Sequence, residues 1–321
     1  MSQAESSPTR AGYAPLNPFS FGLATLAVML WSGNAVASQF AFDLLPPVFV
    51  GAVRFALASV FMILWCFVEG APVWIVKKED WWRSFWLGFL LFVQIASFNV
   101  GLAYTTSSHA TLLVNSYIFW VAIYEQFIQR SIQLRWWQVS GLLLAATGAS
   151  LLLIDNGPSQ SADQVTLFGD LVLAASGFCL AIKIIYTKHA VRFASPGTLI
   201  LWHDVIGAAL MFAWAGCTET IPEVRLSLGT LIGLFYVSIV VSGFCFAANA
   251  WLLQRHGASQ VSVFSFVTPV CGVILAILFR GDQISIWLVL ASILVAVGIL
   301  LANIGGGQAP SAGAKQFEAE A

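Results

Sequence analysis

Four ionisable residues stand inside stretches of the chain that are otherwise apolar. They are Arg54, Lys183 and the adjacent pair His203 and Asp204. A charge in the hydrocarbon of a bilayer is costly, so such side chains normally face the interior of a helix bundle or a water-filled cavity. Because histidine changes charge near neutral pH, His203 and Asp204 are the best candidates for proton coupling.

These four residues are our gating or coupling candidates, and each has an alternative. Arg54 and Lys183 could snorkel, with the charged end reaching back to the headgroups. Lys183 could instead attract a carboxylate or a phosphate group in a cavity. The same snorkelling alternative holds for His203 and Asp204.

Asparagines form a second set of polar residues in apolar stretches. Asn99 and Asn249 are 150 residues apart, which suggests equivalent positions in two halves of the chain. Both could face a central cavity and hold a polar substrate, or each could make only an interhelical hydrogen bond. Asn34 follows Gly33 and lies near Trp31, a combination that suits close approach of a substrate or close packing of helices.

Two further stretches combine polar and aromatic groups. Asn115 and Tyr117 belong to a stretch that is polar on two sides, and the sequence leaves open which side faces a cavity. Ser265 and Thr268 precede Pro269. Proline removes a backbone donor, so this helix could have a hinge or a static kink there. We therefore expect Trp31, Asn34, Asn99, Asn115, Tyr117, Asn249, Ser265 and Thr268 to line a substrate cavity.

Composition limits the class of protein. Only 9% of the 321 residues are charged and 59% are apolar, whereas soluble domains carry roughly 25% charged residues. Most of the surface must therefore face lipid. The formal net charge of -1 gives no indication of a nucleic-acid partner. The five cysteines lie apart and form no CxxC pair or His/Cys cluster, so no metal or cofactor is expected.

The motifs that the chain lacks argue against several activities. It has no GxxxxGK[ST] loop for ATP hydrolysis and no HExxH zinc motif, and its four histidines are scattered. We therefore expect no enzyme, although an intramembrane protease or transferase is one alternative. A sensor or scaffold without transport is another, but the short loops offer no obvious output surface.

Ten stretches are long and apolar enough to span a bilayer as helices. If the N-terminus is cytoplasmic, ten of the Lys and Arg residues in the tails and loops lie on the cytoplasmic side of the membrane and two lie on the opposite side. This distribution satisfies the positive-inside rule. The prediction is a multi-pass protein of the inner (cytoplasmic) membrane with both termini in the cytoplasm. Polar tails over 1–18 and 305–321 are expected to be disordered. The predicted helices are 19–42, 47–68, 84–104, 109–128, 136–154, 168–187, 197–216, 229–252, 259–279 and 285–304.

The two halves of the chain are weakly similar. Pro47 and Pro196 each open the second helix of a half, 149 residues apart, and Gly148 and Gly298 fall late in the last helix of each half, 150 residues apart. Residues 19–154 and 168–304 therefore form two five-helix repeats. Because five is odd, the second repeat enters the membrane from the opposite side, as in many secondary transporters. The predicted fold is all-α, with ten transmembrane helices in two inverted repeats.

Several short motifs resemble the EamA-type family of the drug/metabolite transporter superfamily, in order and over about residues 20–303. Thr268 departs from the family, which commonly has Glu there, so substrate specificity does not carry over. The motifs are Trp31-Ser32-Gly33-Asn34, Pro46-Pro47 with Arg54-Phe55, the run from Gly101 to Ser107, and His256-Gly257-Ala258-Ser259 with Thr268-Pro269.

The resemblance implies a secondary transporter that moves a small metabolite by alternating access, often as an exporter. The aromatic residues around the polar candidates favour an amino acid or a related amphipathic metabolite. The partners expected are therefore a small-molecule substrate and membrane lipid. A homodimer is also possible through small residues at Gly141, Ala145 and Ala149, although the same face could pack within one chain.

Overall fold

The described part of the structure, a computed structural model, is helical and covers residues 17–75, 77–128, 135–152, 166–220, 227–256, 261 and 263–303. Helices occupy all ten predicted stretches. Six of them are long and apolar enough to cross a membrane. Their elements are α1 (Pro18–Ser32) with α2 (Asn34–Phe42), α3 (Pro47–Glu69), α4 (Lys78–Ala103), α8 (Leu167–Ala190), α9 (Pro196–Thr218), and α10 (Leu228–Phe235) with η2 (Tyr236–Cys245) and α11 (Phe246–Arg255).

The other four stretches are shorter or interrupted. Their elements are α5 (Ser107–Val114), α6 (Tyr117–Ile123) and η1 (Tyr124–Ile128), then α7 (Trp136–Leu152), then η3 (Val263–Phe266) with α13 (Val267–Arg280), and α14 (Ile286–Asn303). Apart from Asn17, which caps α1, and Pro18, which begins it, the predicted tails lie outside the described residues.

One predicted boundary is wrong by six residues. We expected the third helix to begin at residue 84, where the apolar run starts, but α4 begins at Lys78. Its first turn carries Glu79 and Asp80. Acidic side chains stabilise the positive end of the helix dipole, so this polar turn is helical although it is not apolar.

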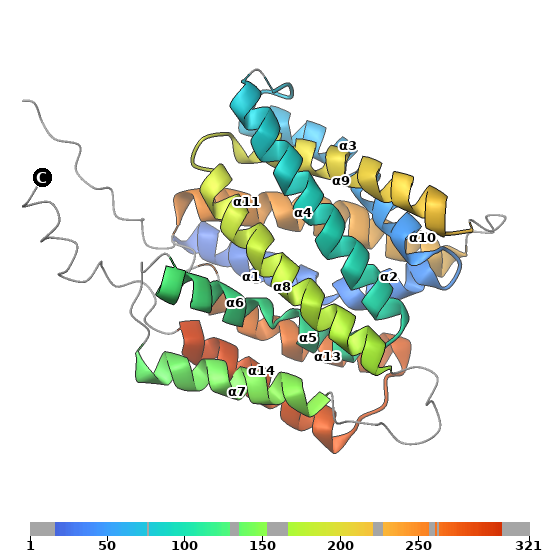
Figure 1. The fold of residues 1–321 in the computed structure, drawn as a ribbon, viewed down its shortest axis with the longest axis vertical. Coiled ribbons are helices and arrows are strands. Elements are labelled where there is room, and N and C mark those ends of the chain that lie inside the picture. The colour runs from blue at the N-terminus through green and yellow to red at the C-terminus, as the bar shows by residue number, and fades with distance from the viewer. Residues whose placement is uncertain are drawn as a thin grey trace, which may run out of the picture.

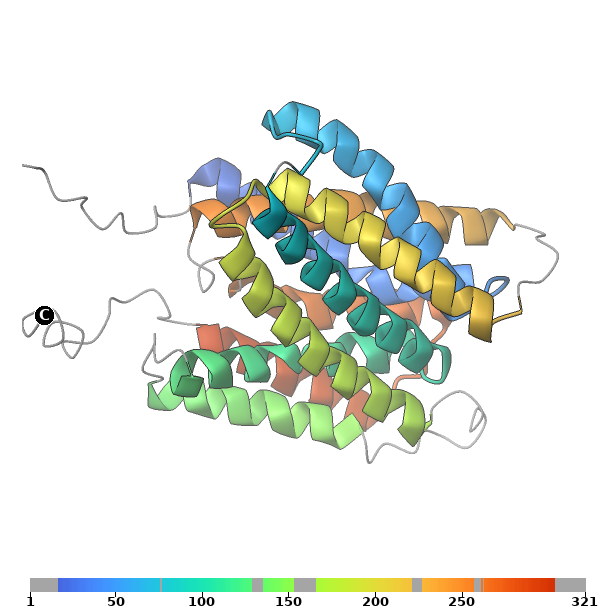
Figure 2. The same cartoon turned by 45° about the horizontal axis from the view of Figure 1, so that its top comes forward.

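The two repeats are interleaved. The most extensive helix contacts join α3 to α9, α4 to α8 and α9, and α7 to α14, and each of these pairs takes one helix from each side of residue 153. In Figures 1 and 2, α3 (blue) lies beside α9 (yellow), and α7 (green) lies beside α14 (red). The core of the molecule is therefore shared between the repeats.

The contact between α3 and α9 is reciprocal at its two ends. After α9, the carboxylate of Glu219 accepts hydrogen bonds from the backbone amides of Val48 and Phe49, at 2.8 Å each. At the end of α3, Oε2 of Glu69 accepts one from Gly197 N at 2.9 Å. Each helix thus has its amino-terminal amides satisfied by a carboxylate from the end of the other, as an antiparallel, two-fold arrangement requires.

The seam between α7 and α14 consists of small residues. A methyl group added at Gly298 would lie 2.5 Å from Ala145 N, and one at Gly141 would lie 2.6 Å from Ala302 N. The two backbones are therefore as close as glycine allows. The face of α7 at Gly141 and Ala145 packs against α14 of the same chain, and the homodimer stays a prediction.

Candidate functional site

The four ionisable candidates lie deep in the bundle. Arg54 on α3 is 1% exposed, Lys183 on α8 is 6% exposed, and His203 and Asp204 on α9 are 2% and 0% exposed. We refer to these four residues as the charged cluster. The snorkelling alternative is wrong for Arg54 and Lys183, because neither charged group reaches the surface of the bundle.

Arg54 is held by the second repeat. Its Nε donates to Oγ of Ser242 at 2.5 Å, whereas its Nη1 is buried without a hydrogen-bond partner among the described residues. Ser242 belongs to η2, a π-helical segment of ten residues. Such wide turns occur frequently at functional sites. The guanidinium is therefore positioned at one nitrogen and free to bind at another.

Lys183 is positioned by a helix of the first repeat. Its Nζ donates to Oε1 of Gln94 at 3.2 Å and lies 4.6 Å from the centre of the Phe246 ring. Gln94 on α4 is itself fixed, because the hydroxyl of Ser176 donates to its backbone carbonyl at 2.8 Å. The ammonium group therefore has both a polar acceptor and an aromatic ring within reach.

Asp204 brings the negative charge of the cluster. His203 Nδ1 lies 2.8 Å from one of its oxygens. The two residues are adjacent on the helix, however, and neither carboxylate oxygen has a hydrogen-bond partner among the described residues. Asp204 interacts electrostatically with both Arg54 and Lys183. Asp204 is thus influenced by charges from two other helices, in addition to its contact with His203.

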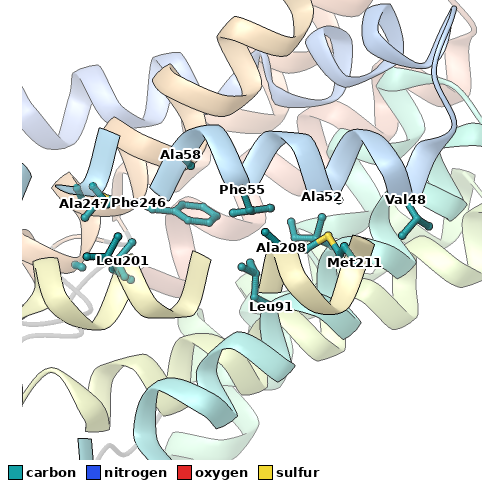
Figure 3. Close-up of a cluster of buried hydrophobic side chains, with 14 of the residues drawn as sticks. Val48, Ala52, Phe55, Ala58, Leu91, Leu201, Ala208, Met211, Phe246 and Ala247 are labelled. Carbon is teal, nitrogen blue, oxygen red and sulfur yellow. The ribbon is translucent and has the colours of Figure 1, made fainter. Parts of the chain in front are cut away.

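Aromatic rings line the same region. The ring of Phe246 lies 4.9 Å from Trp31, 6.0 Å from Phe55 and 6.1 Å from His203, centre to centre. Figure 3 shows Phe55 of α3 next to Phe246 of α11, within the apolar core that also includes Leu201 and Ala208 of α9. The predicted cavity residue Trp31 is therefore linked to His203 of the charged cluster through the ring of Phe246.

The break between α1 and α2 adjoins this aromatic group. Helix α1 ends at Ser32 and α2 begins at Asn34. The hydroxyl of Tyr236, from η2, donates to the carbonyl of Leu30 at 2.6 Å. A methyl group added at Gly33 would lie 2.7 Å from that hydroxyl, so the tyrosine fits only against glycine. Asn34 Oδ1 is buried without a partner among the described residues.

Other predicted cavity residues meet elsewhere, where the α5–α6 stretch crosses η3 and α13. The hydroxyl of Tyr117 donates to Oγ of Ser265 at 3.3 Å, and Nδ2 of Asn115 donates to the carbonyl of Thr111 at 2.6 Å. Thr268 is partly exposed, and Pro269 stands in the first turn of α13. Helix α13 begins at Val267, so Pro269 lies in a turn whose amides have no partner within the helix, and not in the helix interior.

The two asparagines that we related by symmetry differ. Asn99 is buried, and its Nδ2 donates to the carbonyl of Pro47 at 2.8 Å, which is an interhelical bond; its Oδ1 has no partner in the described structure. Asn249 on α11 is partly exposed. The hydrogen bond of Asn99 does not involve Asn249, and the place of both residues in a cavity stays a prediction.

Four residues around the charged cluster were not predicted from the sequence: Gln94, Ser176, Ser242 and Phe246. Gln94 alone left a signal, as a polar residue inside an apolar stretch. A hydrogen-bond network away from the charged cluster was also not predicted. In this network Asp170 accepts from the hydroxyl of Thr105 at 2.8 Å and lies 3.0 Å from Nδ1 of His109. This network joins α5 to the first turn of α8. The described residues contain no cluster of His, Cys, Asp or Glu that could hold a metal.

In the described part of the chain, helices occupy all ten apolar stretches and bury charged side chains between them, which defines a multi-pass membrane protein. The model of the EamA-like transporter family matches residues 19–154 and 167–304. The chain belongs to this family, which builds its ten helices from two inverted five-helix repeats. The family and the similar proteins are named as transporters.

The similar proteins have low identity but nearly full coverage. An uncharacterized transporter of Bacillus subtilis, YoaV, is 22% identical over 275 residues, which cover 85% of this chain and 92% of that protein. A probable amino-acid metabolite efflux pump of Escherichia coli K12 is 24% identical over 88% of this chain and 94% of its own. A solved crystal structure aligns with 91% of this chain and 98% of its own chain, with a TM-score of 0.68. At 17% sequence identity this similarity supports the fold alone.

Proposed function

We propose that the protein is a secondary transporter that exports a small metabolite by alternating access. An amino acid or a related amphipathic metabolite is the favoured substrate. The observation that carries this proposal is the charged cluster, because Arg54 comes from the first repeat while Lys183 and Asp204 come from the second. A solute bound there touches both repeats, so their relative movement can carry it from one side to the other.

The reciprocal ends of α3 and α9 support alternating access. Glu219 binds the start of α3 at one end of the pair, and Glu69 binds the start of α9 at the other. Two conformations of similar energy, one open to each side, follow naturally from such a two-fold arrangement. The name of the Escherichia coli relative agrees with export of an amino-acid metabolite.

The proposed setting is the inner membrane, with both termini in the cytoplasm. Lys77, Lys78 and Arg83 would then lie on the cytoplasmic side. The loop that precedes them is joined to the start of α9, because the hydroxyl of Thr198 donates to the carbonyl of Pro72 at 2.5 Å. The basic residues and the α8–α9 turn therefore lie at one end of the bundle, as this orientation requires.

The proposal is tested by comparing the medium and the contents of cells with and without the protein, using untargeted mass spectrometry. Asp204→Asn removes the buried carboxylate, and Asp43→Asn makes the same chemical change at an exposed residue. We expect one class of metabolite to rise in the medium with the wild type and with Asp43→Asn, and to fall at least about tenfold with Asp204→Asn. Accumulation inside cells would contradict export, and no change with abundant folded protein would contradict transport.

A further inference from the structure

The formal charges of the cluster do not balance. Arg54 and Lys183 bring two positive charges and Asp204 one negative charge, so one positive charge is in excess when His203 is neutral. Among the described residues, the main electrostatic influences of charged side chains on these groups come from within the cluster itself. An uncompensated buried charge is strongly unfavourable, and the excess therefore selects for a ligand with one negative charge.

The unpaired donor belongs to Arg54. Lys183 already donates to Gln94, and Nε of Arg54 already donates to Ser242. Nη1 of Arg54 is buried without a partner in the described structure. A guanidinium is the side chain best suited to hold a carboxylate, so the free nitrogen and the excess charge point to the same group.

We propose that the substrate of the charged cluster carries a carboxylate that binds Arg54, with a single net negative charge at that end of the molecule, and that cations are rejected. The inference rests on the proposed function, since it names the chemistry of what is transported. A phosphate monoester, which brings close to two negative charges, would leave the site overcompensated. The rings of Phe246 and Trp31 supply an apolar surface for the rest of the substrate.

Three probes with one phenylpropyl body separate these charges. They are 3-phenylpropionate (anionic), 3-phenylpropanamide (neutral) and 3-phenylpropylamine (cationic). Binding to the purified full chain in nanodiscs is measured for each by titration calorimetry. We expect the acid to bind at least about 30-fold more tightly than the amide or the amine, because the latter two leave a buried charge unpaired. Equal affinities, a preference for the amine, or no binding by the acid would overturn the proposal.

Variants assign the preference to particular residues. Arg54→Gln should lower the affinity for the acid about 30-fold and change the affinity for the amide less than about threefold. Arg54→Lys keeps the positive charge, so it should still bind the acid more tightly than the amide. If Arg54→Gln lowers the affinity for all three probes equally, and Arg54→Lys does not restore the affinity for the acid, the proposed role of Arg54 is wrong. Asp204→Asn raises the excess to two charges, so it should shift preference toward the dianion phenylsuccinate or a phosphate monoester.

The failure of this inference can be told apart from the failure of transport. Efflux of a cationic or neutral metabolite that depends on the charged cluster would overturn the inference and leave the transporter proposal standing. Selective binding of 3-phenylpropionate without its counterflow in proteoliposomes would support the inference and contradict transport. L-Phenylalanine, tested alongside, carries an ammonium group beside the same carboxylate, so it should bind more weakly than 3-phenylpropionate and still lose affinity in Arg54→Gln.

Discussion

Replacing Gly298 with alanine should destabilise the contact between α7 and α14. The added methyl group would lie 2.5 Å from Ala145 N and 2.5 Å from the carbonyl oxygen of Gly141. Both are backbone atoms, so they cannot yield by changing a rotamer, and the helices must separate. Overpacking of this kind costs about 1–3 kcal/mol, while alanine in a helix regains about 0.5–1 kcal/mol. The expected net loss is about 1–2 kcal/mol.

The measurement is thermal unfolding of the purified protein in one detergent, followed by intrinsic fluorescence. Gly216→Ala is the matched control, because a methyl group there has no atom within 4 Å. We expect Tm to fall for Gly298→Ala and to stay level or rise for Gly216→Ala. A Tm for Gly298→Ala equal to that of the control would refute the close seam between these two helices.

Three other changes have expected outcomes on the same assay. Tyr236→Phe removes the hydroxyl from the carbonyl of Leu30 and should lower stability by about 1 kcal/mol; an unchanged Tm would mean that the carbonyl finds another donor. Glu219→Gln keeps one acceptor but loses the charge and one of two amide bonds, so a loss of about 1–2 kcal/mol is expected, larger at low salt. Arg280→Ala breaks an exposed pair with Asp43 and should change stability by less than about 1 kcal/mol, so a large fall in Tm would show that this pair is more than a surface contact.

The helices were predictable because lipid demands long apolar runs, and the ten runs are plain in the sequence. Interruptions were less predictable. Gly33 was noticed as a residue for close approach, but the tyrosine that requires it, Tyr236, lies some 200 residues later. The start of α4 was missed because the polar first turn at Lys78 is stabilised by charge and not by burial.

The charged cluster was predictable residue by residue but not as a cluster. Burial of an ionisable group in an apolar run marks Arg54, Lys183 and Asp204 as unusual, whereas their convergence depends on how three helices cross. Snorkelling could be dismissed only after Ser242 and Gln94 were seen to bind the two cations inside the bundle. Serine, glutamine and phenylalanine are common in membrane helices, so nothing in the sequence distinguished these partners.

The interleaving of the repeats has a consequence for biosynthesis. When the ribosome has delivered only the first repeat, Arg54 has no Ser242 to bind, and the start of α3 has no Glu219. The small-residue face of α7 likewise has no packing partner until α14 is synthesised. The first five helices therefore enter the membrane without the partners of one buried charge and of several polar groups, and they reach their final packing only after the second five are inserted. During its insertion the protein thus passes through an incompletely packed intermediate, which membrane chaperones and quality-control proteases can recognise.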